Sequence, residues 1–304
     1  MNPDPVDLAA QLRGRVDGQF ETDRSLGPVR SYHIGGSPAG WLAPVPNAGV
    51  GRALEVIHDH QVPLLILGRG SNLRVSDHGW EGAALYLGEN FSGWRFDNRQ
   101  AKVQAGTLLM DLIRAAVKKG LAGLELLAGI PGGVGGALRM NAGAFGQEIE
   151  QVTVSVSGFR RDGTPISADR RKINFDYRRV PELDRVVITS AIFQFTEENA
   201  ETLKARMEDI LALRAGKQPL NYPSCGSVFK RPAGYYAGAL IEETGLKGKR
   251  IGGAMISRKH AGFILNVDNA KAVDVYALIQ LIEARVLDRF GVQLEREVKL
   301  IGEF

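Results

Sequence analysis

The stretch with the clearest chemical potential is GIPGGVGGALRMNAGAFG, residues 129–146, which holds seven of the chain's 37 glycines. A backbone without Cβ atoms lets a ligand come close, and its N–H groups can then hold phosphate. Asn141, inside this stretch, adds an amide donor and acceptor and tolerates left-handed backbone. Flexible linkers are the alternative, but they are polar, whereas this stretch is apolar and nearly uncharged. We therefore expect a ligand-binding segment here, the glycine cradle.

A second glycine-rich turn follows an apolar run in PLLILGRGSN, residues 63–72. Residues 64–67 predict a buried strand, and successive backbone N–H groups in the turn at 68–72 can form an anion-binding nest. The turn departs from a Rossmann fingerprint because Leu73 occupies the third glycine position and no periodic helix follows. The chain also lacks the GxxxxGK[ST] pattern of P-loop nucleotide-binding proteins.

Three polar side chains are candidates for chemistry on a substrate: Arg178, Ser227 and Glu297. Arg178 has two aromatic neighbours, surroundings that suit a guanidinium holding a carboxylate, although most arginines are solvated. Ser227 is either a turn residue or a hydroxyl presented to a cleft, with Lys230 nearby to hold phosphate. Glu297 is either a solvated strand residue or a carboxylate that supports a proton transfer.

The sequence lacks residues that two other kinds of active site, a serine hydrolase and a zinc site, would need. A serine hydrolase needs a base and a nucleophile elbow, but no GxSxG occurs and the five histidines offer no clear base. A zinc site is not expected either, because the sequence has neither HExxH nor a cysteine pair. We therefore expect no metal.

Length and charge narrow the class of protein further. A chain of 304 residues predicts about two domains, and its net charge of +4 suits a small anionic substrate. Without a basic tail or basic–aromatic alternation, no nucleic-acid partner is expected. The N-terminus lacks a signal-peptide pattern, no apolar run approaches the ~20 residues of a membrane span, and the single Cys225 favours a reducing compartment. We expect a cytoplasmic monomer without a membrane partner.

The spacing of apolar residues predicts an α+β fold. The expected helices are 6–20, one from 47 through about 57, one capped by Thr107 and ended by Gly120, 199–215, 236–244 and 272–290. The expected strands are 64–67, 83–87, 94–98, 102–106, a hairpin turning at Asp162–Gly163, 185–195, 251–256, 262–267 and 292–301. A change in composition after residue 195 predicts a boundary near 197–216, with domains at 1–197 and 198–304.

Seven segments, taken together and in order, resemble the UDP-N-acetylenolpyruvoylglucosamine reductase (MurB) family over about residues 20–302. They are SYHIGGSPA (31–39), ILGRGSNLRVSD (66–77), AGIPGGVGGALRMNAGAFG (128–146), FDYR (175–178), SCGSVFKRP (224–232), ISRKHAGFILN (256–266) and FGVQLEREVKLIG (290–302).

The resemblance implies an FAD-binding domain of the vanillyl-alcohol-oxidase/p-cresol-methylhydroxylase type in two α+β subdomains that divide near 80–90, followed by a C-terminal α+β substrate domain. It implies that non-covalent FAD lies between the turn at 68–73 and the glycine cradle. The FAD-binding residues implied are Gly68, Arg69, Gly70, Ser71, Asn72, Leu73, Ile130, Pro131, Gly132, Gly135, Gly136, Asn141, Ala142 and Gly143.

The reaction that the resemblance implies is the reduction of UDP-N-acetylglucosamine enolpyruvate to UDP-N-acetylmuramate, a step of peptidoglycan precursor synthesis. NADPH would reduce the flavin, and a hydride would pass from flavin N5 to C3 of the substrate. Ser227 would protonate C2, while Arg178 and Glu297 would polarise the substrate carboxyl. The substrate-binding residues implied are Lys217, Lys230, Arg231 and Lys259.

Two features depart from the pattern of many relatives. Arg231 stands where they have asparagine, and the tyrosine-bearing loop that closes over the substrate in long members is not found, which suggests a compact class. Two alternatives stay open from the sequence. A flavin oxidase of the same fold often binds FAD covalently through histidine or cysteine, and neither glycine-rich loop contains a histidine. A non-catalytic nucleotide-binding module would not need Arg178, Ser227 and Glu297.

Overall fold

The chain forms two compact units, each built from segments far apart in the sequence. The computed structural model describes residues 16–22, 24–26, 32–45 and 48–304. Unit 1 comprises Ala39–Arg69, Gly82–Leu213 and the described part of Met1–Thr22. Unit 2 comprises Gly70–Glu81, Arg214–Phe304 and the described part of Asp23–Pro38. The domain division at 197/198, a linear one, stays a prediction.

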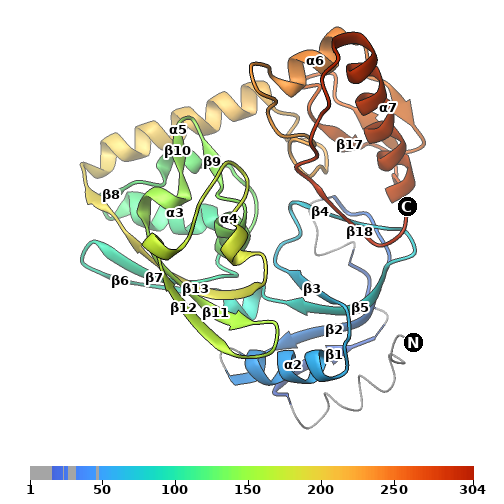
Figure 1. Ribbon diagram of the computed structural model, residues 1–304. Coiled ribbons are helices and arrows are strands. Elements are labelled where there is room, and N and C mark those ends of the chain that lie inside the picture. Colours follow the sequence, from blue (N-terminus) through green and yellow to red (C-terminus); the bar gives the residue numbers. More distant parts are fainter. Residues whose placement is uncertain (1–15, 23, 27–31, 46–47) are drawn as a thin grey trace. The chain divides into compact units, whose positions relative to one another are not determined.

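A four-stranded sheet in the order β1-β2-β5-β3 forms the first part of unit 1 (Figure 1). Its strands are β1 (Gly18–Glu21), β2 (Pro38–Pro44), β5 (Trp80–Tyr86) and β3 (Leu64–Leu67), the last confirming the apolar run at 64–67. Helix α2 (Ala48–Asp59) buries Val50, Leu54 and Ile57 in a core shared with this sheet. These are the residues that its 3.6-residue spacing places on one face.

An antiparallel five-stranded sheet in the order β12-β11-β13-β7-β6 follows. Its strands are β12 (Pro165–Asp169), β11 (Thr153–Arg160), β13 (Val186–Gln194), β7 (Gln100–Gln104) and β6 (Trp94–Asp97). Strand β13 has an almost continuous apolar sequence because both of its faces are buried. Val186 and Ile188 enter the core shared with helix α3 (Leu109–Lys118) and helix α4 (Val134–Arg139), whereas Val187 enters the core shared with α2.

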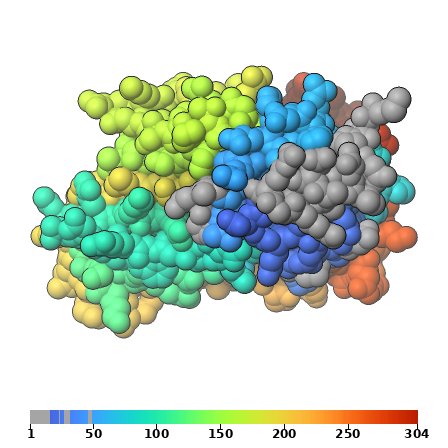
Figure 2. All heavy atoms as spheres, turned by 90° about the horizontal axis from the view of Figure 1, so that it is seen from below, coloured from blue at the N-terminus to red at the C-terminus, as the bar shows by residue number. Residues whose placement is uncertain are grey.

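Unit 1 also contains two short strand pairs, several 3-10 helices and most of a long helix. The pairs are β8 (Leu121–Ala122) with β14 (Thr196–Glu197) and β9 (Gly143–Ala144) with β10 (Gln147–Glu148), and the helix is α5 (Ala200–Lys217), whose residues from Arg214 onward belong to unit 2. The predicted hairpin at Asp162–Gly163 joins β11 to β12, and Gly163 adopts φ +86° in its turn. A Cβ at Gly163 would meet Glu55 of α2, so this turn lies against the helix, as the space-filling view shows (Figure 2).

Unit 2 has its own core around helix α7 (Ala272–Phe290). The five residues predicted to face inward on α7, Val275, Leu278, Ile279, Ile282 and Val286, are all at most 1% exposed. The other elements of unit 2 are α6 (Ala237–Glu243), the sheet of β15 (Arg250–Ile251), β16 (Ala254–Ile256) and β17 (Ile264–Asn266), and the parallel pair β4 (Leu73–Val75) and β18 (Lys299–Ile301). Among the described residues, no helix combines the length and the apolar character needed to cross a membrane.

Three local predictions were wrong. Thr107 does not cap α3, because its buried hydroxyl instead accepts from Gly93 N–H at 2.9 Å and donates to Gly93 O at 3.0 Å. The strand expected at 292–301 is regular only at β18, because the preceding residues bond to the segment at 228–230. The helix expected at 6–20 gives way to β1 from Gly18 onward, and its residues 6–15 lie outside the described residues.

A buried carboxylate links the segment that precedes the glycine cradle to α5. Glu125 is 4% exposed and accepts hydrogen bonds from Gly123 N–H at 2.8 Å and from the Arg206 guanidinium at 2.7 Å. Burial by itself would raise the pKa of Glu125, but the hydrogen bonds from Gly123 and Arg206 outweigh burial and lower it. The ionised form is therefore the one that stabilises the fold.

Replacing Glu125 should make the free energy of unfolding less sensitive to a fall in pH. A carboxyl whose pKa is lowered in the folded state stabilises that state above its unfolded pKa, and the contribution is lost as pH falls. We expect Glu125→Gln to reduce the free energy of unfolding by about 1–3 kcal/mol at pH 7. The difference from the unaltered protein should shrink as pH falls below the ordinary glutamate pKa of ~4.3. Urea unfolding at several pH values measures it, and a difference independent of pH would contradict this role.

Candidate active site

The glycine cradle is bound along its backbone to the loop that precedes α3. Val134 N–H donates to Thr107 O at 2.9 Å, and Gly135 N–H donates to Ala105 O at 2.8 Å. A Cβ at Gly133 would stand 2.9 Å from Ala105 O, and one at Gly135 would stand 2.9 Å from Ala105 Cβ. Glycine is thus required at these two positions because the two backbones approach too closely for a side chain.

Other parts of the cradle border open space. A Cβ at Gly136 would meet nothing within 4 Å, and the same holds for Gly68 at the end of β3. Among the predicted cofactor residues, Pro131 and Gly136 are exposed, whereas Ala142 and Gly143 are buried. The cradle therefore has one packed side and one side that can receive a ligand.

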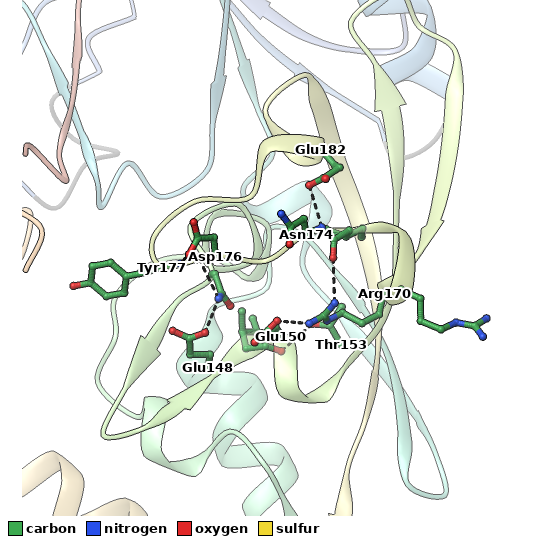
Figure 3. Close-up of polar contacts among 12 residues, drawn as sticks. Glu148, Glu150, Thr153, Arg170, Asn174, Asp176, Tyr177 and Glu182 are labelled. Carbon is green, nitrogen blue, oxygen red and sulfur yellow. Dashed lines mark hydrogen bonds and ion pairs between the residues drawn. The ribbon is translucent and has the colours of Figure 1, made fainter. Parts of the chain in front are cut away.

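Asn141 is a fully buried polar residue at the centre of this segment. Its Nδ2 donates to Glu148 Oε2 at 2.7 Å and to Asp176 O at 3.4 Å (Figure 3). Its Oδ1 is buried and has no hydrogen-bond partner among the described residues. A buried acceptor without a partner costs about 1–3 kcal/mol, so this oxygen points to a donor that a ligand would supply.

Arg178 is attached to the same segment. It lies in a tight turn in which Asp176 and Arg179 exchange backbone hydrogen bonds of 2.9 and 3.2 Å, and it adopts the left-handed φ of 54°. Its guanidinium donates to Asn141 O at 3.3 Å and to Gly143 O at 2.8 Å. Unit 1 thus brings together two of the sequence-predicted sites, the cradle and Arg178.

Ser227 and Glu297 lie on adjacent segments of unit 2. Ser227 is exposed and pairs with Phe263 as an isolated β-bridge. Val228, the next residue, donates from N–H to Gly262 O at 2.9 Å and accepts from Glu297 N–H at 2.8 Å. Val228 is therefore held on both sides, with half-buried Glu297 across from it and Ser227 next to it in the chain.

The turn at 68–73 also reaches the Glu297 segment. Gly70 takes the left-handed φ of 57° that the turn requires. Asn72 Nδ2 donates to Glu297 O at 3.2 Å, and Asn72 O accepts from Lys299 N–H at 3.1 Å. Within unit 2, Asn72 is thus joined to the segment that carries Glu297 and continues into β18.

Comparison with known proteins shows which family the chain resembles. Residues 38–169 match the family described as FAD binding domain, and residues 218–301 match the C-terminal domain of UDP-N-acetylenolpyruvoylglucosamine reductase. The reductase of Oceanobacillus iheyensis is 42% identical over 272 residues, which are 89% of this chain and 88% of that protein. The crystal structure of the Thermus caldophilus MurB reductase is 33% identical, covers 94% of this chain and 100% of its own, and has a TM-score of 0.79.

The chain belongs to the UDP-N-acetylenolpyruvoylglucosamine reductase family. Membership confirms the predicted fold class, an α+β FAD-binding domain of the vanillyl-alcohol-oxidase type with a C-terminal domain, and FAD as the cofactor. A more distant structure, the glucose dehydrogenase Phl p 4.0202, is 17% identical over 64% of this chain and 44% of its own, with a TM-score of 0.51, and shares the fold alone. The family assignment favours an enzyme, and a reductase, over the two alternatives left open by the sequence.

The residues of the cradle fit this cofactor. Gly136 borders open space, and the buried Oδ1 of Asn141 offers an acceptor that the described residues leave unused. FAD carries both the long shape and the hydrogen-bond donors that such a site needs. The individual FAD contacts of this reductase stay predictions.

The cations predicted to bind substrate lie in unit 2 at four exposed or half-buried positions. Lys230 Nζ is 2.5 Å from Glu295 Oε1, and the Arg231 guanidinium stacks 4.0 Å from the centre of the Tyr236 ring. Lys259 Nζ donates to Ala215 O at 2.6 Å near the end of α5, where Lys217 is exposed. Their role in this reductase stays a prediction.

Sequence reasoning missed Glu148 and Asp176, which bond to the Asn141 amide. A signal for Glu148 was available, because it is the first acidic residue after a glycine-rich stretch that is almost uncharged. No comparable signal marked Asp176, whose contribution is its backbone carbonyl.

Gly136 offers a direct test of the open side of the cradle. Gly136→Ala should leave the apoprotein at least as stable, since the Cβ meets nothing and alanine is favoured in helices by about 1 kcal/mol. FAD affinity should fall about tenfold, because overpacking against a ligand costs about 1–3 kcal/mol. Fluorescence titration of the apoprotein with FAD measures this. Gly216→Ala, in the last turn of α5 and equally open, is the matched control; unchanged affinity in Gly136→Ala would contradict the site.

Proposed function

We propose that this chain reduces UDP-N-acetylglucosamine enolpyruvate to UDP-N-acetylmuramate in peptidoglycan precursor synthesis, with NADPH as the reductant. The observation that carries the proposal is its similarity, across about nine tenths of the chain, to proteins named as reductases of the enolpyruvoyl compound. The FAD-binding match and the attachment of Arg178 to the cradle support it. A cytoplasmic monomer is part of the same proposal.

The cofactor and the protein contribute different parts of the proposed reaction. The turn at 68–73 and the glycine cradle would hold FAD, and the bound cofactor would supply hydride transfer between NADPH and C3 of the enolpyruvyl group. The protein supplies binding, orientation and a proton. Lys217, Lys230, Arg231 and Lys259 provide the positive charge for the diphosphate of the substrate.

Ser227 donates the proton to C2. Its O–H bond breaks as the C2–H bond forms, and water then returns a proton to the oxygen. Ser227 is exposed, while the hydrogen bonds of Val228 fix the backbone directly after it. A donor held in one place needs little reorganisation when the proton moves.

Arg178 and Glu297 stabilise the negative charge that develops on the substrate carboxyl. A guanidinium anchored to two carbonyl oxygens is held in a fixed orientation, which suits recognition of a carboxylate. Glu297 can help only in its protonated form, because only then does its side chain donate a hydrogen bond. Its backbone bond to Val228 O holds its main chain against the residue that follows Ser227.

The role of Ser227 is tested by separating the two half-reactions. In Ser227→Ala, the rate of flavin reduction by NADPH should be unchanged. Reoxidation by the enolpyruvyl substrate should slow by about 10²–10⁴-fold, which is the rate enhancement that a general acid usually contributes. Stopped-flow absorbance under nitrogen gives both rates. Ser224→Ala removes another hydroxyl from the same segment as a control. An unchanged reoxidation rate would remove Ser227 from the mechanism.

The forked contact of Arg178 predicts that lysine cannot replace it. Arg178→Lys keeps the charge but loses the bonds to the two carbonyl oxygens. We expect kcat to fall by about 10²–10³-fold, with FAD still bound. Arg179→Lys, at an exposed neighbouring position, should keep full activity. Equal kcat values in the two variants would show that Arg178 contributes charge only.

A further inference from the structure

Glu148 makes a short contact with the one fully buried amide of the cradle. It lies in β10, opposite Gly143 of β9. Its Oε2 accepts from Asn141 Nδ2 at 2.7 Å, the contact drawn beside Glu148 in Figure 3. Because Asn141 is 0% exposed, water does not compete for its amide. Hydrogen bonds to an ionised group are about twice as strong as those between neutral groups.

This contact decides which way the amide of Asn141 faces. A side-chain amide can exchange its oxygen and nitrogen by turning over. In Asn141 the nitrogen faces two acceptors, the Glu148 carboxylate and the carbonyl oxygen of Asp176. Turning the amide over would set its oxygen against both, an unfavourable arrangement for three acceptors. Oδ1 is therefore held on the opposite side, where it is buried and no described residue donates to it.

We propose that Glu148 is a positioning residue that orients the Asn141 amide so that Oδ1 accepts a hydrogen bond from bound FAD. The donors that FAD offers are the isoalloxazine N3–H and the hydroxyls of its sugar chain. The bond is absent in the free protein and made in the complex, so it contributes to affinity for FAD. This inference rests on the proposed placement of FAD in the glycine cradle.

The same amide also supports Arg178. Asn141 Nδ2 contacts Asp176 O, at the start of the turn that carries Arg178, and the guanidinium of Arg178 returns to Asn141 O. Loss of the Glu148 contact therefore loosens the support of Arg178 together with the FAD acceptor.

Exchanging the amide and the carboxylate between positions 141 and 148 tests the inference. Asn141→Asp sets a second carboxylate against Glu148 and should raise the Kd for FAD about tenfold or more. Glu148→Gln lets the amide of Asn141 face either way and should raise Kd about threefold. In the double variant, the amide at position 148 can donate to one carboxylate oxygen at 141, while the other oxygen still faces the ligand. Its Kd should return to within about threefold of the unaltered protein.

Glu150→Gln is the matched control. Glu150 lies two residues further on and pairs with Arg170 instead of Asn141 (Figure 3). The Kd for FAD should be unchanged in this variant. Fluorescence titration of each apoprotein with FAD gives Kd, and thermal unfolding without FAD gives stability.

Three results would overturn the inference. The first is that the two single effects on Kd multiply in the double variant, because Glu148 would then not act through Asn141. The second is coupling in the stability of the apoprotein but none in Kd, because the network would then be structural only. If Asn141→Asp does not fold, equal Kd values in Glu148→Gln and Glu150→Gln would be the third. Failure of the unaltered protein to bind FAD would instead contradict the proposed function.

Discussion

The arrangement of the cradle in unit 1 depends on the hydrogen bonds of the buried Asn141 amide. A polar group removed from water must find partners within the protein or in a ligand. Asn141 meets this requirement on its nitrogen through Glu148 and Asp176, and its backbone oxygen receives the Arg178 guanidinium. One residue thus fixes β10, the turn at 176–179 and the cradle relative to one another. Asn141 Oδ1 has no partner among the described residues, so it is the atom of this network that can accept a hydrogen bond from a ligand.

Unit 2 positions its candidate residues in another way, through backbone pairing. The segment at 227–230 bonds to Gly262 on one side and to the residues before β18 on the other. Ser227 and Glu297 are consequently placed by main-chain hydrogen bonds, which do not depend on their own side chains. Substitutions at these two positions can therefore change chemistry with little effect on the fold, which is why they are informative in kinetic experiments.

Much of this structure could be predicted from local patterns. The amphipathic spacing of α7 and the apolar run of β3 predicted these elements correctly. Burial of one face or of both faces produces a regular pattern of apolar residues along the chain. The cradle was visible because close backbone approach, as at Gly133 and Gly135, leaves no alternative to glycine. Thr107 was misplaced because its hydroxyl found a partner in Gly93, 14 residues away, and no local rule reports such a partner.

The candidate site was predictable in part for the same reason. Motifs selected Ser227, Arg178 and Glu297 as candidates, whereas the contact between Glu148 and Asn141 appears only when β9 and β10 form their hairpin. The interleaving of the units was also hidden, since residues 70–81 join the C-terminal segment through the parallel pairing of β4 with β18. Long-range pairing of this kind leaves little trace in the spacing of residues along the chain.

The central claim is that the FAD of this chain carries electrons from NADPH to an enolpyruvyl sugar nucleotide. The most direct measurement is the visible spectrum of the purified, FAD-loaded protein without oxygen, with NADPH added first and the enolpyruvyl substrate second. The account predicts that NADPH bleaches the yellow flavin and that the substrate restores its colour rapidly. If the colour returned only when oxygen was admitted, the protein would be an oxidase and the account would be wrong.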